Sequence, residues 1–254
     1  MAARRRLDAE LVRRGLATSR SEAQQAVAAG RVTVWGAPAF KVARLVAADE
    51  PVSLLGPGRR FVSRGGEKLD AALSTFAVDV AGCRVLDAGA STGGFTDCVL
   101  QRGAAAVVAV DVGHGQLHER LRRDVRVDNR ERTNVRLLDA ASLGGAVDVV
   151  VADLSFISLR SVLPALLACA RPAGDLVLLV KPQFEAGRIE ASRGKGVIRD
   201  PAIHERVQDE VGAALDAAGA TIMGWMDSPL LGADGNKELF VHARAPVTAV
   251  GDPP

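Results

Sequence analysis

The sequence has few cysteines and no long apolar run. Its three cysteines, Cys83, Cys98 and Cys169, are widely spaced inside predicted apolar segments and form neither a metal-ligand pattern nor an even-numbered disulfide framework. We therefore expect free thiols in a reducing, cytoplasmic compartment and no structural metal. No apolar run approaches the ~20 residues that span a bilayer, so we expect no membrane insertion. The first ten residues, MAARRRLDAE, lack an apolar signal-peptide core, and secretion by the usual route is not expected.

Two common nucleotide-binding motifs are also missing. The chain contains neither the P-loop G-x-x-x-x-G-K-S/T nor the dinucleotide pattern G-x-G-x-x-G. It has instead a predicted strand, glycine-rich turn and amphipathic helix over residues 84–97, RVLDAGASTGGFTD. Ligands of open α/β sheets lie beyond the carboxyl ends of the strands, where Gly89, Gly93 and Gly94 permit a sharp bend or close approach. The stretch predicts a cofactor site and resembles the S-adenosylmethionine loop of Rossmann-type methyltransferases; tight packing alone is the alternative.

Positive charge is concentrated at the amino-terminal end. Residues 1–60 hold 11 Lys and Arg against 5 Asp and Glu, so with a net charge of +2 the remaining residues sum to −4. A basic segment ahead of a mildly acidic body indicates an anionic macromolecular partner. A solvated basic surface without a partner is the alternative.

Residues 1–55 read as a small domain of two short helices followed by short strands. Gly15 is predicted to end the first helix, and Ser19 and Glu22 have capping-box spacing for the second. The segment RVTVWGAPAF alternates as a strand, with a turn predicted at Gly36 to Pro38. The segments RLDAELVRRG and SRSEAQQAVAAGRVTVWG resemble the S4 type of RNA-binding domain. That resemblance implies an α+β fold that presents basic side chains to RNA phosphates. The candidates, each of which could also be a plain surface charge, are Arg4, Arg5, Arg6, Arg13, Arg14, Arg20 and Arg31.

Residues 56–64, GPGRRFVSR, are predicted to be the interdomain linker because Gly56, Pro57 and Gly58 interrupt regular structure. Arg59 and Arg60 are further candidates for contact with RNA backbone. The ring of Phe61 either docks the two domains together or stacks on a base.

Residues 65–246 read as the second domain, of the α/β class. The predicted strands RVLD, AAVVAVD, NVRLL, DVVVAD and DLVLLVK alternate with helical patterns, which is typical of a doubly wound parallel sheet. A last helix, at about 202–218, precedes ATIMGWM and KELFVHAR, which resemble the antiparallel carboxyl-terminal hairpin of Rossmann-type methyltransferases. Residues 247–254 are predicted to be a disordered tail.

Several acidic and basic residues stand where predicted strands end. Asp111 ends the second strand, where a carboxylate accepts hydrogen bonds from the ribose hydroxyls of a nucleoside cofactor. Asp139 would contact the adenine edge or simply cap a helix. His114 and His118 stand four apart, but no further ligand follows at a metal-site spacing, so we expect no metal there.

Four more polar residues mark the ends of predicted elements: Lys68, Asp153, Lys181 and Glu238. Two apolar strands are predicted to end at Asp153 and Lys181, which places both residues at the predicted cofactor edge of the sheet. A charged residue that is only solvated does not need this placement. Burial and like charge lower a lysine pKa while carboxylates raise it, so such a lysine can be tuned for proton transfer. A structural ion pair is the alternative for each residue taken singly.

This quartet matches the catalytic tetrad of FtsJ-like ribose 2′-O-methyltransferases. Together with SRGGEKL, DAGASTGGFTD, VGHGQL, DLSFISL, LVKPQFEAG, GKGVIRDP and GNKELFVH, it makes the chain resemble the TlyA-type family. The resemblance implies S-adenosylmethionine-dependent methylation of cytidine ribose in 16S ribosomal RNA, 23S ribosomal RNA or both, with ribosomal RNA or ribosomal subunits as partner. It also implies cofactor contacts from Asp87, Gly89, Ser91, Thr92, Gly93, Gly94, Phe95, Asp111, Asp139 and Phe156.

The hypothesis for the reaction is an in-line methyl transfer to a ribose 2′-hydroxyl. Lys181 would orient the hydroxyl and accept its proton, Asp153 would hold that lysine, and Lys68 with Glu238 would shape the surrounding charge. Two alternatives stay open: a non-catalytic RNA-binding or ribosome-assembly factor, and a membrane-active haemolysin, after the older name of some family members. The modified nucleotide and the oligomeric state are not encoded in the motifs.

Overall fold

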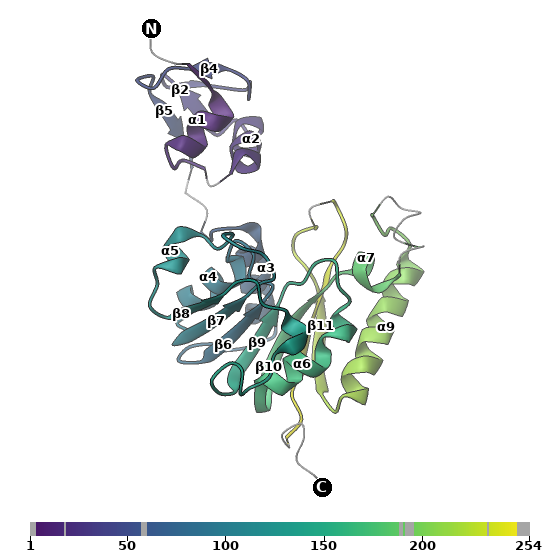
Figure 1. Cartoon of the computed structure of the whole chain (residues 1–254). Helices are drawn as coiled ribbons and strands as arrows, with labels where there is room; N and C mark the ends of the chain where they lie inside the picture. Colours follow the sequence, from purple (N-terminus) through teal and green to yellow (C-terminus); the bar gives the residue numbers. More distant parts are fainter. Residues whose placement is uncertain are drawn as a thin grey trace. The chain divides into compact units, whose positions relative to one another are not determined.

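The computed structural model describes residues 4–17, 19–56, 60–187, 190, 196–232 and 234–247. The chain divides into two compact units, residues 1–60 and 61–254 (Figure 1). Three of the sequence predictions concern residues outside this description. They are the RNA contact of Arg59, the turn at Pro57 and Gly58, and the disordered tail 247–254 beyond its first residue.

The first unit packs two helices against short strands. The elements are β1 (Arg5–Arg6), α1 (Leu7–Arg13), α2 (Arg20–Ala28), β2 (Val32–Val34), β3 (Ala37–Pro38), β4 (Leu45–Val46) and β5 (Val52–Leu54). Strands β3, β2 and β5 form an antiparallel sheet in that order, and β1 pairs with β4. Ser19 caps α2, since its hydroxyl accepts from Glu22 N at 3.2 Å. The core is built on Leu7, Leu11 and Val27, which are fully buried.

The second unit is built on a seven-stranded sheet in the order β11-β12-β10-β9-β6-β7-β8. The strands are β6 (Arg84–Ala88), β7 (Ala106–Val110), β8 (Val127–Arg130), β9 (Val147–Ala152), β10 (Ala170–Val180), β11 (Thr221–Asp227) and β12 (Leu239–Arg244). The pairs β10·β9, β9·β6, β6·β7 and β7·β8 are parallel, while β12 is antiparallel to β10 and β11. The predicted α/β fold with an antiparallel carboxyl-terminal hairpin is confirmed.

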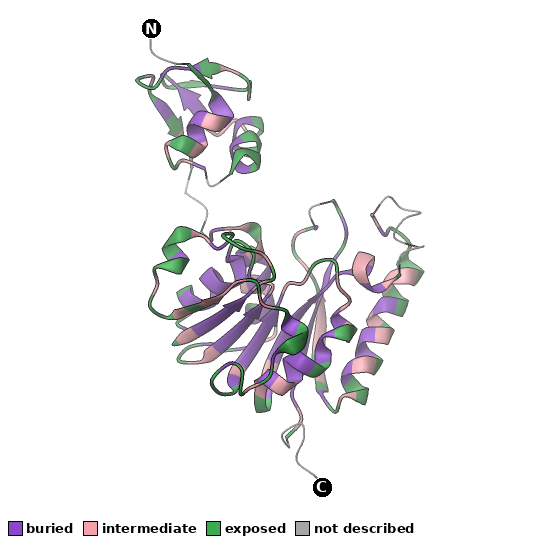
Figure 2. Cartoon of the chain, in the orientation of Figure 1, coloured by how far each residue is buried: buried purple, intermediate pink, exposed green. Residues whose placement is uncertain are grey.

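Helices cover both faces of this sheet, and the central strands are buried between them (Figure 2). One face packs against α3 (Arg64–Thr75) and α4 (Gly94–Gln101), and the other against α6 (Leu163–Cys169) and α9 (Pro201–Ala217). Burial on both faces explains the continuous apolar runs of β7, β9 and β10. The short elements are α5 (Glu119–Arg122), α7 (Pro182–Glu185), η1 (Val135–Leu137) and η2 (Leu159–Ser161). Within the described ranges, no helix combines the length and apolarity needed to cross a membrane.

The strand predicted at NVRLL is wrong. Residues 135–137 form the 3₁₀ helix η1, in which Val135 is buried and Leu137 is 79% exposed. The strand that follows β7 is β8, with the polar sequence VDNR. Because β8 is an edge strand, it needs no continuous apolar run, and its hydrophobic signal is therefore weak.

The segment after Arg60 packs into the second unit. Phe61 and Val62 are buried in the core cluster that contains α3 and α4, and Val62 N donates to Asp97 Oδ2 at 2.8 Å. A Cβ on Gly66 would lie 2.4 Å from Phe61 Cβ, so the ring lies directly against the first turn of α3. The interdomain role suggested for Phe61 and the 56–64 linker boundaries stay predictions.

Candidate functional site

A cavity of about 580 Å³ opens at the carboxyl edge of the sheet, between the loops that follow β6, β7 and β9. This size is typical of small-molecule sites. Its wall includes five residues that the sequence assigned to cofactor binding or catalysis: Gly89, Ser91, Asp111, Asp153 and Phe156. The other ten residues of the wall were not assigned from the sequence: Val112, Gly113, Gln116, Asn134, Val135, Arg136, Leu154, Ser155, Ile157 and Val162. Six of these ten lie in VGHGQL and DLSFISL, so the motifs themselves held the signal.

Asp111 is fixed in the cavity wall by backbone donors. Its Oδ2 accepts from Ser91 N at 2.8 Å and its Oδ1 accepts from Gly113 N at 2.7 Å. The carboxylate thus joins the loop after β6 to the loop after β7. Each oxygen keeps a second lone pair, so the group can still accept hydrogen bonds from hydroxyls in the cavity.

Two residues of the cavity wall have a strained backbone. Ser91 has φ 47° and Phe156 has φ 64°, although neither residue is glycine. The Phe156 side chain is 91% exposed, and its ring lies 5.3 Å from the Phe184 ring, centroid to centroid. Gly89 has φ 86°, and a Cβ there would lie 2.6 Å from Asp153 O, so only glycine fits. Backbone strain of this kind is typical of ligand sites.

The other residues of the glycine-rich turn have packing contacts and do not line the cavity. A Cβ on Gly93 would lie 2.2 Å from Leu121 Cδ1, and one on Gly94 would lie 2.2 Å from Ser63 Oγ. Phe95 is buried in the core, with its ring 6.2 Å from that of Phe240. Thr92, which is exposed, accepts from His118 N through its carbonyl. Gly93 and Gly94 therefore allow the start of α4 to lie close to the side chains of Leu121 and Ser63.

Asp87 and Asp139, both predicted cofactor ligands, also lie outside the cavity wall. Asp87 is fully buried and accepts from Thr96 Oγ1 at 2.6 Å; burial raises the pKa of this carboxyl to about 7. Asp139 accepts from Ser142 N at 2.6 Å, a backbone hydrogen bond that lowers its pKa. Asp139 thus holds a turn over residues 139–142, where no helix begins, and its contact with adenine stays a prediction.

The four tetrad residues form two ion pairs, in which Lys68, Glu238 and Lys181 are buried and Asp153 is partly exposed. Lys68 Nζ, from α3, lies 2.5 Å from Glu238 Oε2, and Lys181 Nζ lies 2.5 Å from Asp153 Oδ1. Lys181 also donates to Ser155 Oγ at 2.9 Å, and its ammonium lies 5.9 Å from the Phe184 ring centroid. Both lysine side chains are at most 10% exposed, so each charge is compensated mainly by its carboxylate.

Strand register brings three of these residues to one edge of the sheet. Asp153 follows β9 and Lys181 follows β10, whose Leu178 is in register with Ala152. Glu238 immediately precedes β12, and Leu239 pairs with Val180. The tetrad therefore lies at the carboxyl edge, where Asp153 also lines the cavity.

Two buried polar residues hold the loops that carry this site. Glu185 accepts from Ser158 Oγ at 2.6 Å and from Leu159 N at 2.5 Å, which fixes the loop that contains Phe156. Asn236 accepts from Ile198 N at 2.9 Å and donates to Gly196 O at 2.8 Å. The segment before Glu238 is thus tied to residues 196–198.

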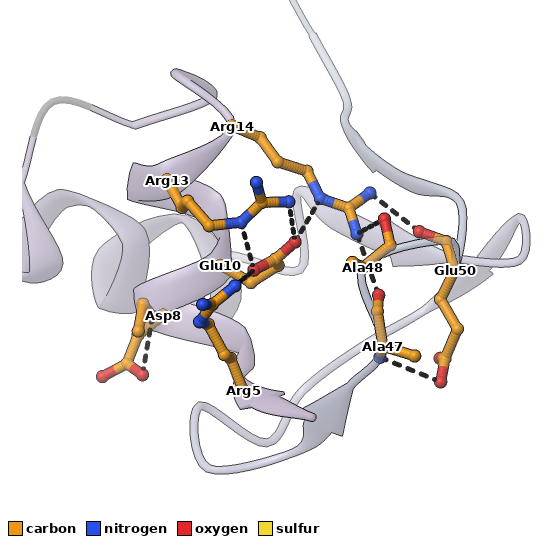
Figure 3. A network of polar contacts seen from close by, with 9 residues as sticks. Arg5, Asp8, Glu10, Arg13, Arg14, Ala47, Ala48 and Glu50 are labelled. Atoms are coloured by element: carbon orange, nitrogen blue, oxygen red, sulfur yellow. Dashed lines mark hydrogen bonds and ion pairs between the residues drawn. The ribbon is translucent and has the colours of Figure 1, made fainter. Parts of the chain in front are cut away.

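In the first unit, several of the predicted RNA-binding arginines contact one of two buried carboxylates, Glu10 and Asp8. Figure 3 shows the group around Glu10. Arg13 binds Glu10 through two hydrogen bonds of 2.8 and 2.6 Å, and Arg5 Nη1 lies 3.9 Å from the same carboxylate. Asp8 accepts from Arg6 at 3.1 and 3.3 Å and from Arg20 at 2.9 Å. These guanidinium groups remain about half exposed, so they can still contact phosphate.

Arg14 differs from the other arginines of this group. Its side chain is only 17% exposed, and it donates to Glu10 Oε1 at 2.8 Å and to three backbone carbonyls. The acceptors are Glu50 O, Ala47 O and Ala48 O, at 2.7, 3.0 and 3.1 Å (Figure 3). Arg14 therefore ties α1 to the 47–50 loop. Elsewhere in this unit, Arg4 lies 3.4 Å from Glu50, Arg31 is half-buried and Arg60 is exposed.

The described residues contain no group of three or more His, Cys, Asp or Glu side chains able to hold a metal ion. His114 Nδ1 lies 2.7 Å from Glu131 Oε2, and His118 accepts from Arg120 N at 3.3 Å as the cap of α5. The two histidines thus have separate structural contacts.

Comparison with known proteins gives a consistent family assignment for both units. Residues 61–245 match the FtsJ-like methyltransferases, and residues 5–46 match the S4 domain. The chain is 51% identical over 245 residues to the 16S/23S rRNA (cytidine-2′-O)-methyltransferase TlyA of Mycobacterium tuberculosis, covering 96% of this chain and 91% of that protein. It is 37% identical to Hemolysin A of Brachyspira hyodysenteriae, covering 93% and 98% of the two chains. A solved structure from Streptococcus thermophilus superposes with a TM-score of 0.76 at 39% identity, over 97% of this chain and 90% of that one.

Proposed function

This chain belongs to the FtsJ-like methyltransferase family, and we propose that it methylates the 2′-hydroxyl of cytidine ribose in ribosomal RNA. The observation that carries the proposal is the pair of buried lysine–carboxylate contacts at one edge of the sheet, beside a cavity of cofactor size. The 51% identical relative is named for this activity on 16S and 23S RNA.

The cofactor proposed for the cavity is S-adenosylmethionine, and the residues present fit its chemistry. The Asp111 carboxylate suits the ribose hydroxyls, and the apolar Leu154 and Ile157 side chains suit the adenine ring. Asp153 provides a negative charge for the cationic part of the molecule. When bound, this cofactor supplies a methyl group on a sulfonium, which is a good leaving group.

We propose that Lys181 is the group that accepts the proton of the ribose 2′-hydroxyl. Asp153, at 2.5 Å, and Ser155, at 2.9 Å, fix the position of Lys181 Nζ, which would accept the proton of the ribose 2′-hydroxyl in its neutral form. Lys68 and Glu238 form the second pair and would orient the nucleotide beside the first. Most of the rate enhancement would come from positioning and charge rather than from covalent catalysis.

The first unit would hold the RNA. Its arginines Arg5, Arg6, Arg13 and Arg20 keep exposed guanidinium groups while buried carboxylates fix them at their inner sides. A set of guanidinium groups held in place loses less conformational freedom when it binds phosphate. We leave Arg14 out of this role because it is mostly buried and its guanidinium group makes four hydrogen bonds within the unit.

The test is transfer of labelled methyl from S-adenosylmethionine to isolated ribosomal subunits that lack the modification. We expect label in RNA, in an alkali-resistant linkage because a 2′-O-methyl group blocks cleavage at that ribose. The Lys181→Ala variant should lose the label, whereas Lys237→Ala, which removes an exposed lysine next to Glu238, should retain it. Tight RNA binding without label in the wild-type protein would favour a non-catalytic assembly factor instead.

A further inference from the structure

Trp35 is an exposed aromatic residue at a position that disfavours it. It lies with Gly36 in the two-residue turn between β2 and β3, where Val34 pairs with Ala37. Trp35 has φ 57° and Gly36 has φ 76°, the signs required by a type I′ turn. Asparagine and aspartate are preferred at the first position of such turns, because a bulky side chain is strained at positive φ.

Nothing in the core compensates for this strain. The Trp35 side chain is 67% exposed, so its ring gains little from burial. Its backbone is held, since Trp35 N donates to Pro51 O at 2.9 Å. The hairpin therefore presents a large aromatic ring from a rigid turn, and an unfavourable conformation that persists without a packing reason points to a binding role.

Trp35 lines a hollow of about 510 Å³ in the first unit. The other residues of its wall are Arg4, Arg44, Leu45, Ala47, Asp49 and Glu50. Glu50 is engaged, because it lies 3.4 Å from Arg4 and accepts from Ala47 N at 3.2 Å. The wall thus combines an aromatic face with guanidinium donors and the carboxylate of the exposed Asp49.

We propose that this hollow binds an unpaired nucleobase of the RNA substrate, stacked on the Trp35 indole. A base offers a flat face to the ring and a polar edge to the wall, where carboxylates can accept from an exocyclic amino group and guanidinium groups can donate to ring acceptors. Two charges of each sign line the hollow, so it is poorly suited to a free phosphate. The site would anchor a bulged or loop nucleotide to the first unit and would not hold the nucleotide that is methylated. The inference rests on the proposed RNA substrate.

A nucleobase is favoured over a protein side chain by the surroundings of the site. The unit matches the S4 domain and carries the exposed arginines described above. An RNA held on those arginines brings its bases within reach of the same small unit, whereas a protein partner would have to compete with the basic charge. Base–aromatic stacking is also tolerant of sequence, as an anchoring contact requires.

Tryptophan fluorescence tests the stacking directly. The chain has two tryptophans, so the Trp225→Phe variant leaves Trp35 as the single emitter. We expect an RNA hairpin with an unpaired loop to quench this emission on binding, and a blunt duplex of the same stem sequence to bind without quenching. Equal emission in the free and hairpin-bound protein would overturn the proposal.

Substitution of Trp35 separates binding from folding, because the two should change in opposite directions. Trp35→Asn places a preferred residue in the turn, so the thermal transition should rise by a few degrees. The same variant should bind the hairpin about tenfold more weakly, which is the range of one lost base stack. Trp35→Phe should keep most of the affinity.

The matched control is Phe40→Asn, since Phe40 is another exposed aromatic of this unit, at 70%, that does not line the hollow. This variant should bind the hairpin as the wild type does. Equal losses for Phe40→Asn and Trp35→Asn, or no loss for either, would contradict the site. If the wild type methylates subunits and Trp35→Asn binds them as tightly as the wild type does, only this inference fails. If the wild type neither binds nor methylates RNA, the proposed function itself is refuted. If Trp35→Asn binds RNA as tightly as the wild type but binds proteins of an extract more weakly, the occupant of the hollow is a protein and the nucleobase proposal is overturned.

Discussion

Buried carboxylates have opposite pKa shifts in the two units, because those of the first unit contact arginines and Asp87 of the second does not. In the first unit, hydrogen bonds from Arg13 and then Arg14 lower the pKa of Glu10 to about 2. Burial alone would raise the pKa of Asp8, yet its bonds to Arg6, Gln24 and Arg20 leave it well below the usual range. In the second unit, Asp87 has one hydroxyl donor and no cation, and burial raises its pKa to about 7.

This difference separates two uses of charge. Asp8 and Glu10 each collect several arginines whose outer faces stay exposed, which suits a surface that binds a polyanion. The tetrad instead pairs each buried lysine with one carboxylate, which suits a site where one proton must move. We therefore expect the first unit to determine affinity for RNA and the second to determine the rate.

The largest expected effect comes from breaking a pair in the second unit. Lys181→Ala and Asp153→Asn should lower the single-turnover rate of methyl transfer by about a thousandfold, the size of a lost proton acceptor with its positioning group. Asp153 is 24% exposed, so thermal unfolding should change little. Rapid quenching with labelled cofactor measures the rate. A variant with the wild-type rate would show that these pairs are structural.

Breaking a cluster in the first unit should act on stability instead. Glu10→Gln removes the acceptor charge shared by Arg13 and Arg14, which we expect to cost about 2 kcal/mol of the free energy of unfolding of that unit. Amide hydrogen exchange of α1 in the full chain should become faster, while exchange in β6 and β9 stays unchanged. Slower exchange in α1 would mean that the desolvation of the Glu10 carboxylate costs more free energy than its contacts with Arg13 and Arg14 contribute.

The two modes of burial predict opposite responses to pH. Because folded Asp87 keeps its proton up to about pH 7 while the unfolded chain releases it near 3.8, the second unit should lose about 2 kcal/mol of stability between pH 5 and pH 7. Asp87→Asn should flatten this slope in urea unfolding. The stability supplied by Asp8 and Glu10 is present above about pH 4.5 and is lost as pH falls toward 2. A second unit equally stable at pH 5 and pH 7 would contradict the account of Asp87.

The smallest expected effects are those of substituting Arg13 and Arg14, which are adjacent in the sequence but differ in their contacts. Arg14→Ala removes donors to three carbonyls of the 47–50 loop, whereas Arg13→Ala removes an outer guanidinium group. We expect Arg14→Ala to destabilise the first unit by about 1 kcal/mol and to leave RNA affinity little changed once folded. Arg13→Ala should weaken RNA binding and reduce its salt dependence. Filter binding at several salt concentrations checks both. The reverse ranking in RNA affinity would show that Arg14 is available to phosphate.

Much of the fold follows from the sequence because buried parallel strands produce unmistakable apolar runs. The failure at NVRLL has the same origin, since the edge strand β8 is polar and the nearby apolar Val135 belongs to a 3₁₀ helix. The tetrad could be predicted as a set because Asp153 and Lys181 directly follow strands and Glu238 directly precedes one. Lys68 differs, since it lies inside α3 and was predicted only through the motif that contains it. The pairing of the tetrad could not be predicted, because Lys68 and Glu238 are 170 positions apart and meet only through the packing of α3.

The cavity residues show a similar limit. A glycine-rich turn indicates a ligand site, but the sequence does not say which glycine faces the ligand. Gly89 lies at the cavity, whereas Gly93 and Gly94 admit neighbouring side chains. Likewise, a run of arginines indicates RNA, yet only the structure reveals that Arg14 is used internally.

The most direct test of the division between the units is single-turnover methyl transfer as a function of ribosomal-subunit concentration, for Lys181→Ala and Arg20→Ala. Lys181→Ala should lower the maximum rate without moving the half-saturating concentration. Arg20→Ala should raise that concentration and keep the maximum rate. A normal maximum rate in Lys181→Ala, or a lowered one in Arg20→Ala at saturation, would contradict the assignment of catalysis to the second unit and binding to the first.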